Sequence, residues 1–319
     1  MADPISDFIE AMEASGISPI EPIADKLASG NIIRFRAKGD KPGRQNGWAR
    51  IYLDGMPAGA FGHFRLGIHE TWKSGTALCA ISSAERRAII IRARKNVAIR
   101  KAESLAKQQA AASVAREHWN DAHAPDPTHA YLKSKGISPF GIRQRGDALL
   151  VPMVDRFFRL WSMQSIFPDG RKRFLSGGRT DGLFWPHGAH FADGRPSPGP
   201  LIIGEGFATM AAIHIATGYG VIAAMSAFNL EAVAFAMRAQ FPDRTLIIAA
   251  DDDRHLKNNI GLTVAIKAAA AVNGLMATPL PPAGAEPCFT GRGLDFADIP
   301  RAQIAALIGS AVVTGASHE

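Results

Sequence analysis

Between Pro200 and Pro279 the sequence alternates short apolar runs with longer amphipathic segments, and this alternation restricts the possible folds more than any other feature. Short apolar runs suit strands that are buried on both faces, and helices between them connect parallel neighbours. We therefore predict an α/β domain in which a parallel sheet is flanked by helices. The expected strands are 201–204, 220–224, 245–250 and 276–279, and the expected helices are 207–217, 230–241 and 261–273.

The residues before this region divide into three segments of different composition. Residues 1–83 predict an N-terminal α+β unit, and residues 84–124, rich in Ala, Arg, Lys and Gln, predict a basic helical linker. Residues 125–198 predict a small, basic, mixed α+β subdomain, which leaves 199–319 as the last domain. The strands expected in these earlier segments are 32–36, 48–53, 58–64, 149–154 and 160–167.

Acidic residues follow the ends of the predicted parallel strands. They are Glu205 after the first strand, Asp251, Asp252 and Asp253 after the third, and Asp295 and Asp298 after the last. Ligand sites of parallel sheets lie beyond the carboxyl ends of the strands, so we expect these acids to meet at one edge. A lone Asp-x-Asp is more typical of a solvated turn, but Glu205 at the end of another strand of the same predicted sheet favours a shared site. Two carboxylates about 4 Å apart repel by roughly 4 kcal/mol at an effective dielectric constant near 20, which favours a bound hard cation such as Mg²⁺.

Charge and cysteine content narrow the class of protein. The formal net charge of +7 and the pI of about 9.6 are typical of a nucleic-acid-binding protein, although a basic protein without a polyanionic partner fits them equally. Cys79 and Cys288 form no CxxC pair, and His187 and His190 lack a third nearby ligand, so we expect no zinc site. The acidic N-terminus has no signal-peptide core and the chain has no long uncharged apolar run, so we expect a cytoplasmic location and no membrane segment.

Five segments together resemble the Toprim fold of bacterial-type primases, topoisomerases and some nucleases, and they are most similar to the primases of plasmids and phages. Glu205-Gly206 begins a predicted helix after an apolar strand, and Asp251-x-Asp253 lies two strands later. The other similar segments are 129–136, 169–178 and 293–298. Thr209 departs from the pattern, because bacterial chromosomal primases usually carry Asp there, and the zinc-binding template reader of those primases is not expected here.

The resemblance implies a nucleotidyltransferase that makes short RNA primers on single-stranded DNA from ribonucleoside triphosphates by two-metal phosphoryl transfer. Asp251 and Asp253 would hold Mg²⁺ or Mn²⁺, Glu205 would bind metal or manage the 3′-hydroxyl proton, and Asp295 and Asp298 would add metal ligands. The cations implied to bind nucleic acid or nucleotide are Lys133, Lys135, Arg143, Lys172, Arg173, Arg254 and Lys257. A replicative helicase on a separate chain is a further implied partner.

Two alternatives share the same residues. A Toprim nuclease would use the acids to cleave rather than join, and a single-stranded DNA-binding accessory protein would bind without turnover. The aromatic residues of the N-terminal unit are more typical of a core than of a base-stacking surface; they are Trp48, Tyr52, Phe61 and Phe64. Because no zinc reader is expected, we predict that the N-terminal part holds the template.

Overall fold

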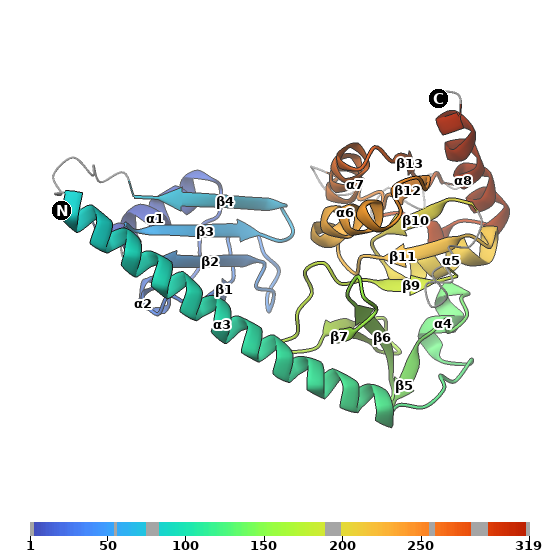
Figure 1. Ribbon diagram of the computed structural model, residues 1–319, viewed down its shortest axis with the longest axis horizontal. Coiled ribbons are helices and arrows are strands. Elements are labelled where there is room, and N and C mark those ends of the chain that lie inside the picture. Colours follow the sequence, from blue (N-terminus) through green and yellow to red (C-terminus); the bar gives the residue numbers. More distant parts are fainter. Residues whose placement is uncertain are drawn as a thin grey trace. The chain divides into compact units, whose positions relative to one another are not determined.

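The computed structural model describes residues 3–53, 56–74, 83–188, 199–254, 259–281 and 293–316. The chain forms two compact units, residues 1–104 and 105–319, and helix α3 (Ser83–Asp121) contributes to both (Figure 1). The finer division at residues 83, 124 and 198 stays a prediction. Among the described helices, none combines the length and the hydropathy that crossing a bilayer requires.

The first unit is an antiparallel sheet with two helices. Its elements are α1 (Pro4–Ala14), α2 (Ala24–Ala28), β1 (Ile33–Phe35), β2 (Gly47–Tyr52), β3 (Ala58–His63) and β4 (Ile68–Lys73), with the strands in sequence order. Phe8 and Met12 of α1 pack on Ile51 and Phe61, which alternation directs to the same face of the sheet. Phe61 is therefore a core residue, which is the role that we favoured for aromatic residues on these strands. Strand β4 was missed in the sequence.

Helix α3 runs from the first unit into the second. It is unbroken over 39 residues because its sequence contains neither Gly nor Pro. Its observed bounds agree closely with the predicted helix. Near its end, Ala115 packs with Leu150 and Met163 of the second unit. Arg143 donates a hydrogen bond of 2.6 Å to the carbonyl oxygen of Trp119, and its guanidinium lies 4.8 Å from the centre of that indole. Arg143, which we predicted to bind nucleic acid, is thus engaged in holding the helix end.

The second unit begins with a small subdomain. Helix α4 (Ala130–Lys135) precedes a four-stranded antiparallel sheet of β5 (Arg143–Arg145), β6 (Ala148–Val154), β7 (Leu160–Ile166) and β8 (Lys172–Phe174), in that order. Strands β6 and β7 match the predicted strands closely. Strand β6 is a continuous run of apolar residues, whereas β7 intersperses Ser and Gln among its apolar residues.

The remainder of the second unit contains the predicted parallel sheet. Its strands are β9 (Trp185–His187), β10 (Leu201–Gly204), β11 (Gly220–Ala223), β12 (Leu246–Ala249) and β13 (Leu275–Ala277), arranged in the order β13-β12-β10-β11-β9. Strands β10 to β13 pair in parallel, which confirms the predicted α/β class. Strand β9, which was missed in the sequence, joins β11 antiparallel at the sheet edge.

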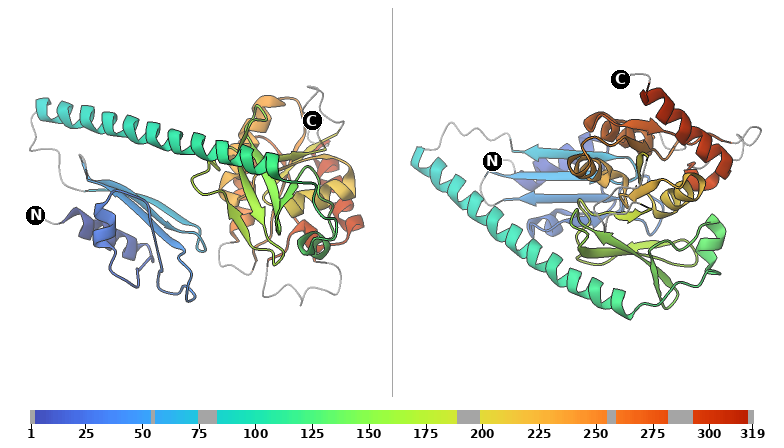
Figure 2. Two further views of the ribbon diagram at one scale, coloured as in Figure 1. Left: turned by 90° about the horizontal axis from the view of Figure 1, so that it is seen from below. Right: turned by 45° about the vertical axis from the view of Figure 1, so that its right-hand side comes forward.

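Helices cover both faces of this sheet because adjacent strand residues point in opposite directions. They are α5 (Phe207–Thr217), α6 (Leu230–Gln240), α7 (Ile260–Ala271) and α8 (Arg301–Ala316). Ile202 and Ile247 pack towards α5 and α8, whereas Ile203 and Ile248 pack towards α6 and α7. Figures 1 and 2 show the two helix pairs on opposite sides of the sheet. Strands β10 and β12 are fully buried, and their parallel register places their carboxyl ends side by side.

His187, which we did not expect to bind zinc, lies in β9, and His190 is outside the described residues. The ring centre of His187 lies 4.4 Å from that of Phe140 and 4.6 Å from that of His214. Burial, together with the charge of His214, lowers the pKa of His187 to about 4. The ring is therefore a neutral packing group that joins β9 to α5.

Asn229 connects the subdomain to the parallel sheet. Its amide donates hydrogen bonds of 2.7 Å to the carbonyl oxygen of Leu183 and 2.8 Å to that of Ala224, and it accepts one of 2.7 Å from Gly182. The residue is buried, so these backbone groups have no ready access to water. One side chain thereby fixes the segment entering β9 to the end of β11.

Replacing Asn229 by Ala should lower the free energy of unfolding by about 2–3 kcal/mol, because buried backbone groups would lose their partners. Urea denaturation of the whole chain would measure this loss. Asn120→Ala, at an exposed position of α3, is the control and should change the stability by less than about 0.5 kcal/mol. Equal stabilities of the two variants would contradict the bridging role of Asn229.

Candidate active site

The parallel register brings acidic residues to one edge of the sheet. Gly204 pairs with Ala249, so the chain leaves β10 and β12 side by side, and Glu205 and Asp251 follow at once. Asp295 reaches the same edge on the loop that leads into the short helix η4 (Phe296–Asp298). The expectation that these strand ends share one edge is confirmed.

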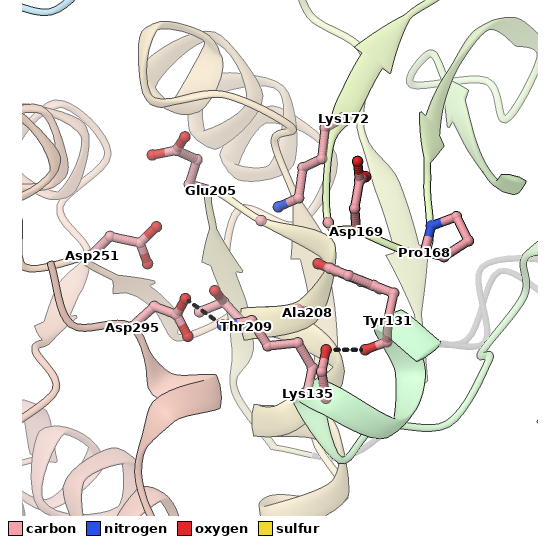
Figure 3. Close-up of a pocket in the computed structure, with 13 residues that line it drawn as sticks. Tyr131, Lys135, Pro168, Asp169, Lys172, Glu205, Ala208, Thr209, Asp251 and Asp295 are labelled. Carbon is pink, nitrogen blue, oxygen red and sulfur yellow. Dashed lines mark hydrogen bonds and ion pairs between the residues drawn. The ribbon is translucent and has the colours of Figure 1, made fainter. Parts of the chain in front are cut away.

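These acids line a pocket of about 450 Å³ between the subdomain and the parallel sheet (Figure 3). The acidic side is formed by Glu205, Asp251 and Asp295, and the opposite side includes Tyr131 and Lys172. The other lining residues are Ser134, Lys135, Pro168, Asp169, Gly170, Gly206, Ala208 and Thr209. Carboxylates and a few cations thus face a common space large enough for part of a nucleotide.

Burial and mutual repulsion make the two central acids costly to ionise. Burial, followed by the charge of Asp253, raises the pKa of Glu205. Burial, followed by the charge of Glu205, raises the pKa of Asp251 well above its ordinary value. The charge of Lys172 opposes both shifts without cancelling them. In addition, Oδ1 of Asp251 is buried with no hydrogen-bond partner in the described part of the chain.

Asp251 and Asp253 do not occupy equivalent positions. Strand β12 ends at Ala249, so the acids lie in a loop instead of continuing the strand's alternation. Asp251 lines the pocket, whereas Oδ2 of Asp253 accepts a hydrogen bond of 3.0 Å from the backbone of Gly261 in α7. Asp253 still lies close enough to Glu205 to raise its pKa.

The third acidic group is already neutralised in part. Lys135 Nζ lies 3.3 Å from Asp295 Oδ2 and 3.2 Å from Asp298 Oδ1. Asp295 caps η4 by accepting from the backbone of Ala297 at 2.7 Å. Burial alone would lower the pKa of Lys135, but the charges of Asp295 and Asp298 raise it. Asp295 lines the pocket and Asp298 does not.

The comparisons with known proteins agree with this geometry. Residues 200–306 match the family model described as a Toprim domain. This part of the chain is a Toprim domain. It contains β10 to β13, and the three acidic groups that meet at the edge of their sheet.

The chain is also homologous to two proteins named DNA primase TraC from Escherichia coli. It is 33% identical to one over 285 residues and 35% identical to the other over 290, in each case over 87% of this chain. The chain spans only 26% and 20% of the lengths of these relatives. Among solved structures, one similar to this chain is that of the DnaG primase catalytic domain bound to ssDNA, with 12% sequence identity and a TM-score of 0.44. The match covers 67% of this chain and 80% of the DnaG chain.

The predicted nucleic-acid-binding cations are dispersed around the Toprim domain. Lys172 lines the pocket, while Arg173, next along strand β8, lies 5.9 Å from the ring centre of Phe167. Adjacent strand residues face opposite ways, so these two cations do not act on one ligand atom. Lys133 is exposed outside the pocket lining, and Arg254 forms an ion pair with Asp252. Lys257 lies outside the described residues.

Tyr131 was not predicted as a site residue, although it lies in one of the segments that resemble primases. Its hydroxyl is buried with no hydrogen-bond partner in the described ranges, and burial raises its pKa to about 12. The ammonium of Lys172 lies 6.0 Å from the centre of its ring. Tyr131 therefore places a neutral hydroxyl in the pocket lined by Glu205, Asp251 and Asp295, which we call the Toprim pocket. The position of a tyrosine in the sequence does not by itself reveal such a role.

Asp251→Asn should raise the melting temperature without added metal, because it removes a buried charge that Glu205 and Asp253 repel. A gain of about 1 kcal/mol corresponds to a rise of roughly 2–4 °C for a unit of this size. The folded-state pKa of Asp251 lies above its unfolded value, so the wild-type protein loses stability as pH rises between the two values. The difference between the proteins should therefore be large at pH 8 and small below about pH 4.

Melting curves at several pH values, recorded in a chelator, would measure this effect. Asp243→Asn, which neutralises an exposed acid of the same domain, is the matched control and should show no such pH-dependent gain. A melting temperature for Asp251→Asn at or below that of the wild type at pH 8 would refute the repulsion.

Proposed function

We propose that this chain is the catalytic part of a DNA primase, which synthesises short RNA primers on single-stranded DNA. The observation that supports this most directly is the Toprim pocket, in which Asp251 and Glu205 concentrate buried negative charge opposite Lys172 and Tyr131. Similarity to the two primases named TraC supports the choice of primer synthesis over cleavage.

Mg²⁺ or Mn²⁺ fits the donor set of this pocket. The unpartnered, buried Oδ1 of Asp251 is an oxygen ligand suited to a hard cation. No three acidic, histidine or cysteine side chains in the described ranges are grouped to hold an ion together. Mg²⁺ commonly uses one or two carboxylates with water and substrate phosphates, so such a group is not required. Asp251 and Glu205 would be the first ligands, with Asp253 and Asp295 as further candidates.

The residues of the chain would then divide the chemistry between them. The bound ions would supply positive charge to the attacking and leaving oxygens of nucleotidyl transfer. Glu205 would either bind one of these ions or accept the proton of the primer 3′-hydroxyl. Lys172 would bind a triphosphate oxygen, and the Tyr131 hydroxyl would donate a hydrogen bond to the same ligand.

We infer that the first unit carries the surface that binds the template. Cross-strand pairs place Arg34, Trp48, Gly62 and His69 in one row on the face of the β1–β4 sheet opposite α1. Gly62 gives the indole of Trp48 room, because a Cβ there would lie 2.7 Å from its Nε1. Aromatic and basic side chains on one sheet face suit unpaired bases and their phosphates. We call Arg34, Trp48, His69 and Lys73 the open face. Tyr52, on the same side of the sheet, is not included because the guanidiniums of Arg50 and Arg100 lie 4.6 and 4.3 Å from the centre of its ring.

Asp251→Asn should abolish ribonucleotide incorporation on a single-stranded template while leaving template affinity within about twofold, because the carboxylate acts on metal rather than on DNA. Labelled ribonucleotides with Mg²⁺ or Mn²⁺ would measure incorporation, and Asp243→Asn should retain full activity. Full activity in Asp251→Asn would refute the site. Template degradation by the wild type would indicate a nuclease, and binding without turnover an accessory protein.

Trp48→Ala should weaken binding of single-stranded DNA to the whole chain by about 1–3 kcal/mol, the usual contribution of one stacked base. Lys73→Ala should instead reduce the slope of log affinity against log salt concentration by about one. Fluorescence anisotropy at several salt concentrations would measure both. Lys26→Ala, an exposed cation of α2, is the control and should leave affinity and slope unchanged. Unchanged binding in both open-face variants would assign the first unit another role.

A further inference from the structure

We propose that Asn259 is the positioning residue of the acidic loop, and that its side chain holds Asp252 and Asp253 so that Asp251 faces the pocket. The inference rests on the proposed metal-dependent function of that pocket. Asn259 is not one of the residues that line the pocket, and it acts on the pocket through Asp252 and Asp253.

The side chain of Asn259 contacts three other residues at once. Its Oδ1 accepts hydrogen bonds from the backbone of Asp253 at 2.8 Å and of Leu262 at 3.4 Å. Its Nδ2 donates to Oδ1 of Asp252 at 2.9 Å. A single amide thus joins the loop after β12 to the start of α7.

Asp252 is the fixed point of this arrangement. Its side chain is only 8% exposed, and it also binds Arg254 through the backbone and the guanidinium. Its own backbone exchanges two hydrogen bonds of 2.9 Å with Leu294, on the loop that carries Asp295. The middle acid of the triplet is therefore an anchor, and Asn259 connects that anchor to α7.

The anchor matters because the neighbouring charges repel. Glu205 and Asp295 line the same pocket as Asp251, and like charges repel, so an untethered loop would move the Asp251 carboxylate away from them. The backbone of Ala250 is held by Ala277 at 2.9 Å, and that of Asp252 by Leu294. Asn259 adds a further tether beyond Asp252, by binding the backbone of Asp253 and the side chain of Asp252. Holding the carboxylates together before an ion arrives should raise the affinity for that ion.

Both the amide and the backbone conformation account for asparagine at this position. Residue 259 has a φ of 37° and a ψ of 67°, a left-handed conformation that Asn tolerates better than most residues. The contacts require one acceptor and one donor. An amide has both, whereas a carboxylate has the acceptor but lacks the donor. Asp could cap α7 equally well, but it would repel Asp252.

The test uses two substitutions that separate these properties. Asn259→Gly keeps the left-handed backbone and removes the side chain, whereas Asn259→Asp keeps the helix cap and removes the donor. Asn273→Gly is the matched control, because Asn273 also has a positive φ, of 47°, and lies just beyond the other end of α7. Each whole-chain variant is titrated with Mg²⁺ and Mn²⁺, and the rise in melting temperature gives the midpoint of metal binding without any need for activity.

We expect both Asn259 variants to raise the midpoint at least fivefold, with template affinity within twofold of the wild type and the rate restored at saturating metal. Asn273→Gly should keep the wild-type midpoint. A midpoint within twofold of the wild type in Asn259→Asp, which retains the cap, would overturn the positioning role. If the melting temperature of Asp251→Asn still rises with metal as that of the wild type does, the proposed metal site is wrong, and the inference about Asn259 fails with it. If Asp251→Asn loses this response while both Asn259 variants keep the wild-type midpoint, the metal site stands and only the positioning role of Asn259 is refuted.

Discussion

Parallel pairing of β10 with β12 forces Glu205 and Asp251 to emerge at one sheet edge, and burial there places two like charges in a poorly solvated space. Repulsion between carboxylates grows as the effective dielectric constant falls, so this juxtaposition is costly unless cations offset it. The loops around the pocket can be understood as responses to that cost. They supply positive charge, hydrogen bonds or fixed spacing to the acids.

These responses are distributed unequally among the acids. Asp295 and Asp298 share Lys135, and Asp252 is held by Arg254 and Asn259. Oδ1 of Asp251, by contrast, is buried and unpartnered in the described part of the chain. A buried acid whose hydrogen bonds are satisfied needs no further partner, whereas an unsatisfied one marks a place where a ligand can contribute. The contrast directs attention to the Asp251 side of the pocket.

The first unit depends on a different physical principle, the two-sidedness of an antiparallel sheet. Alternation sends Ile51 and Phe61 to the side covered by Phe8, and sends Trp48 and Arg50 to the opposite side. Small residues in β3 leave space above the sheet for the large side chains of β2. Composition alone could not separate core aromatics from exposed ones, because strand propensity favours aromatic residues on either face.

The sequence by itself determined the α/β class, most helix and strand positions in the second unit, and the convergence of Glu205, Asp251 and Asp295 on one edge. These follow from local periodicity and from the rule that parallel strands end on the same side. The tertiary structure alone decided which acids face the pocket, because Asp253 turns to cap α7 and Lys135 pairs with Asp298 across more than 160 positions of sequence. It also decided that Arg143 holds α3, that Arg254 pairs with Asp252, and that Tyr131 enters the site. Side-chain direction in loops and pairing between distant segments depend on packing that no local pattern encodes.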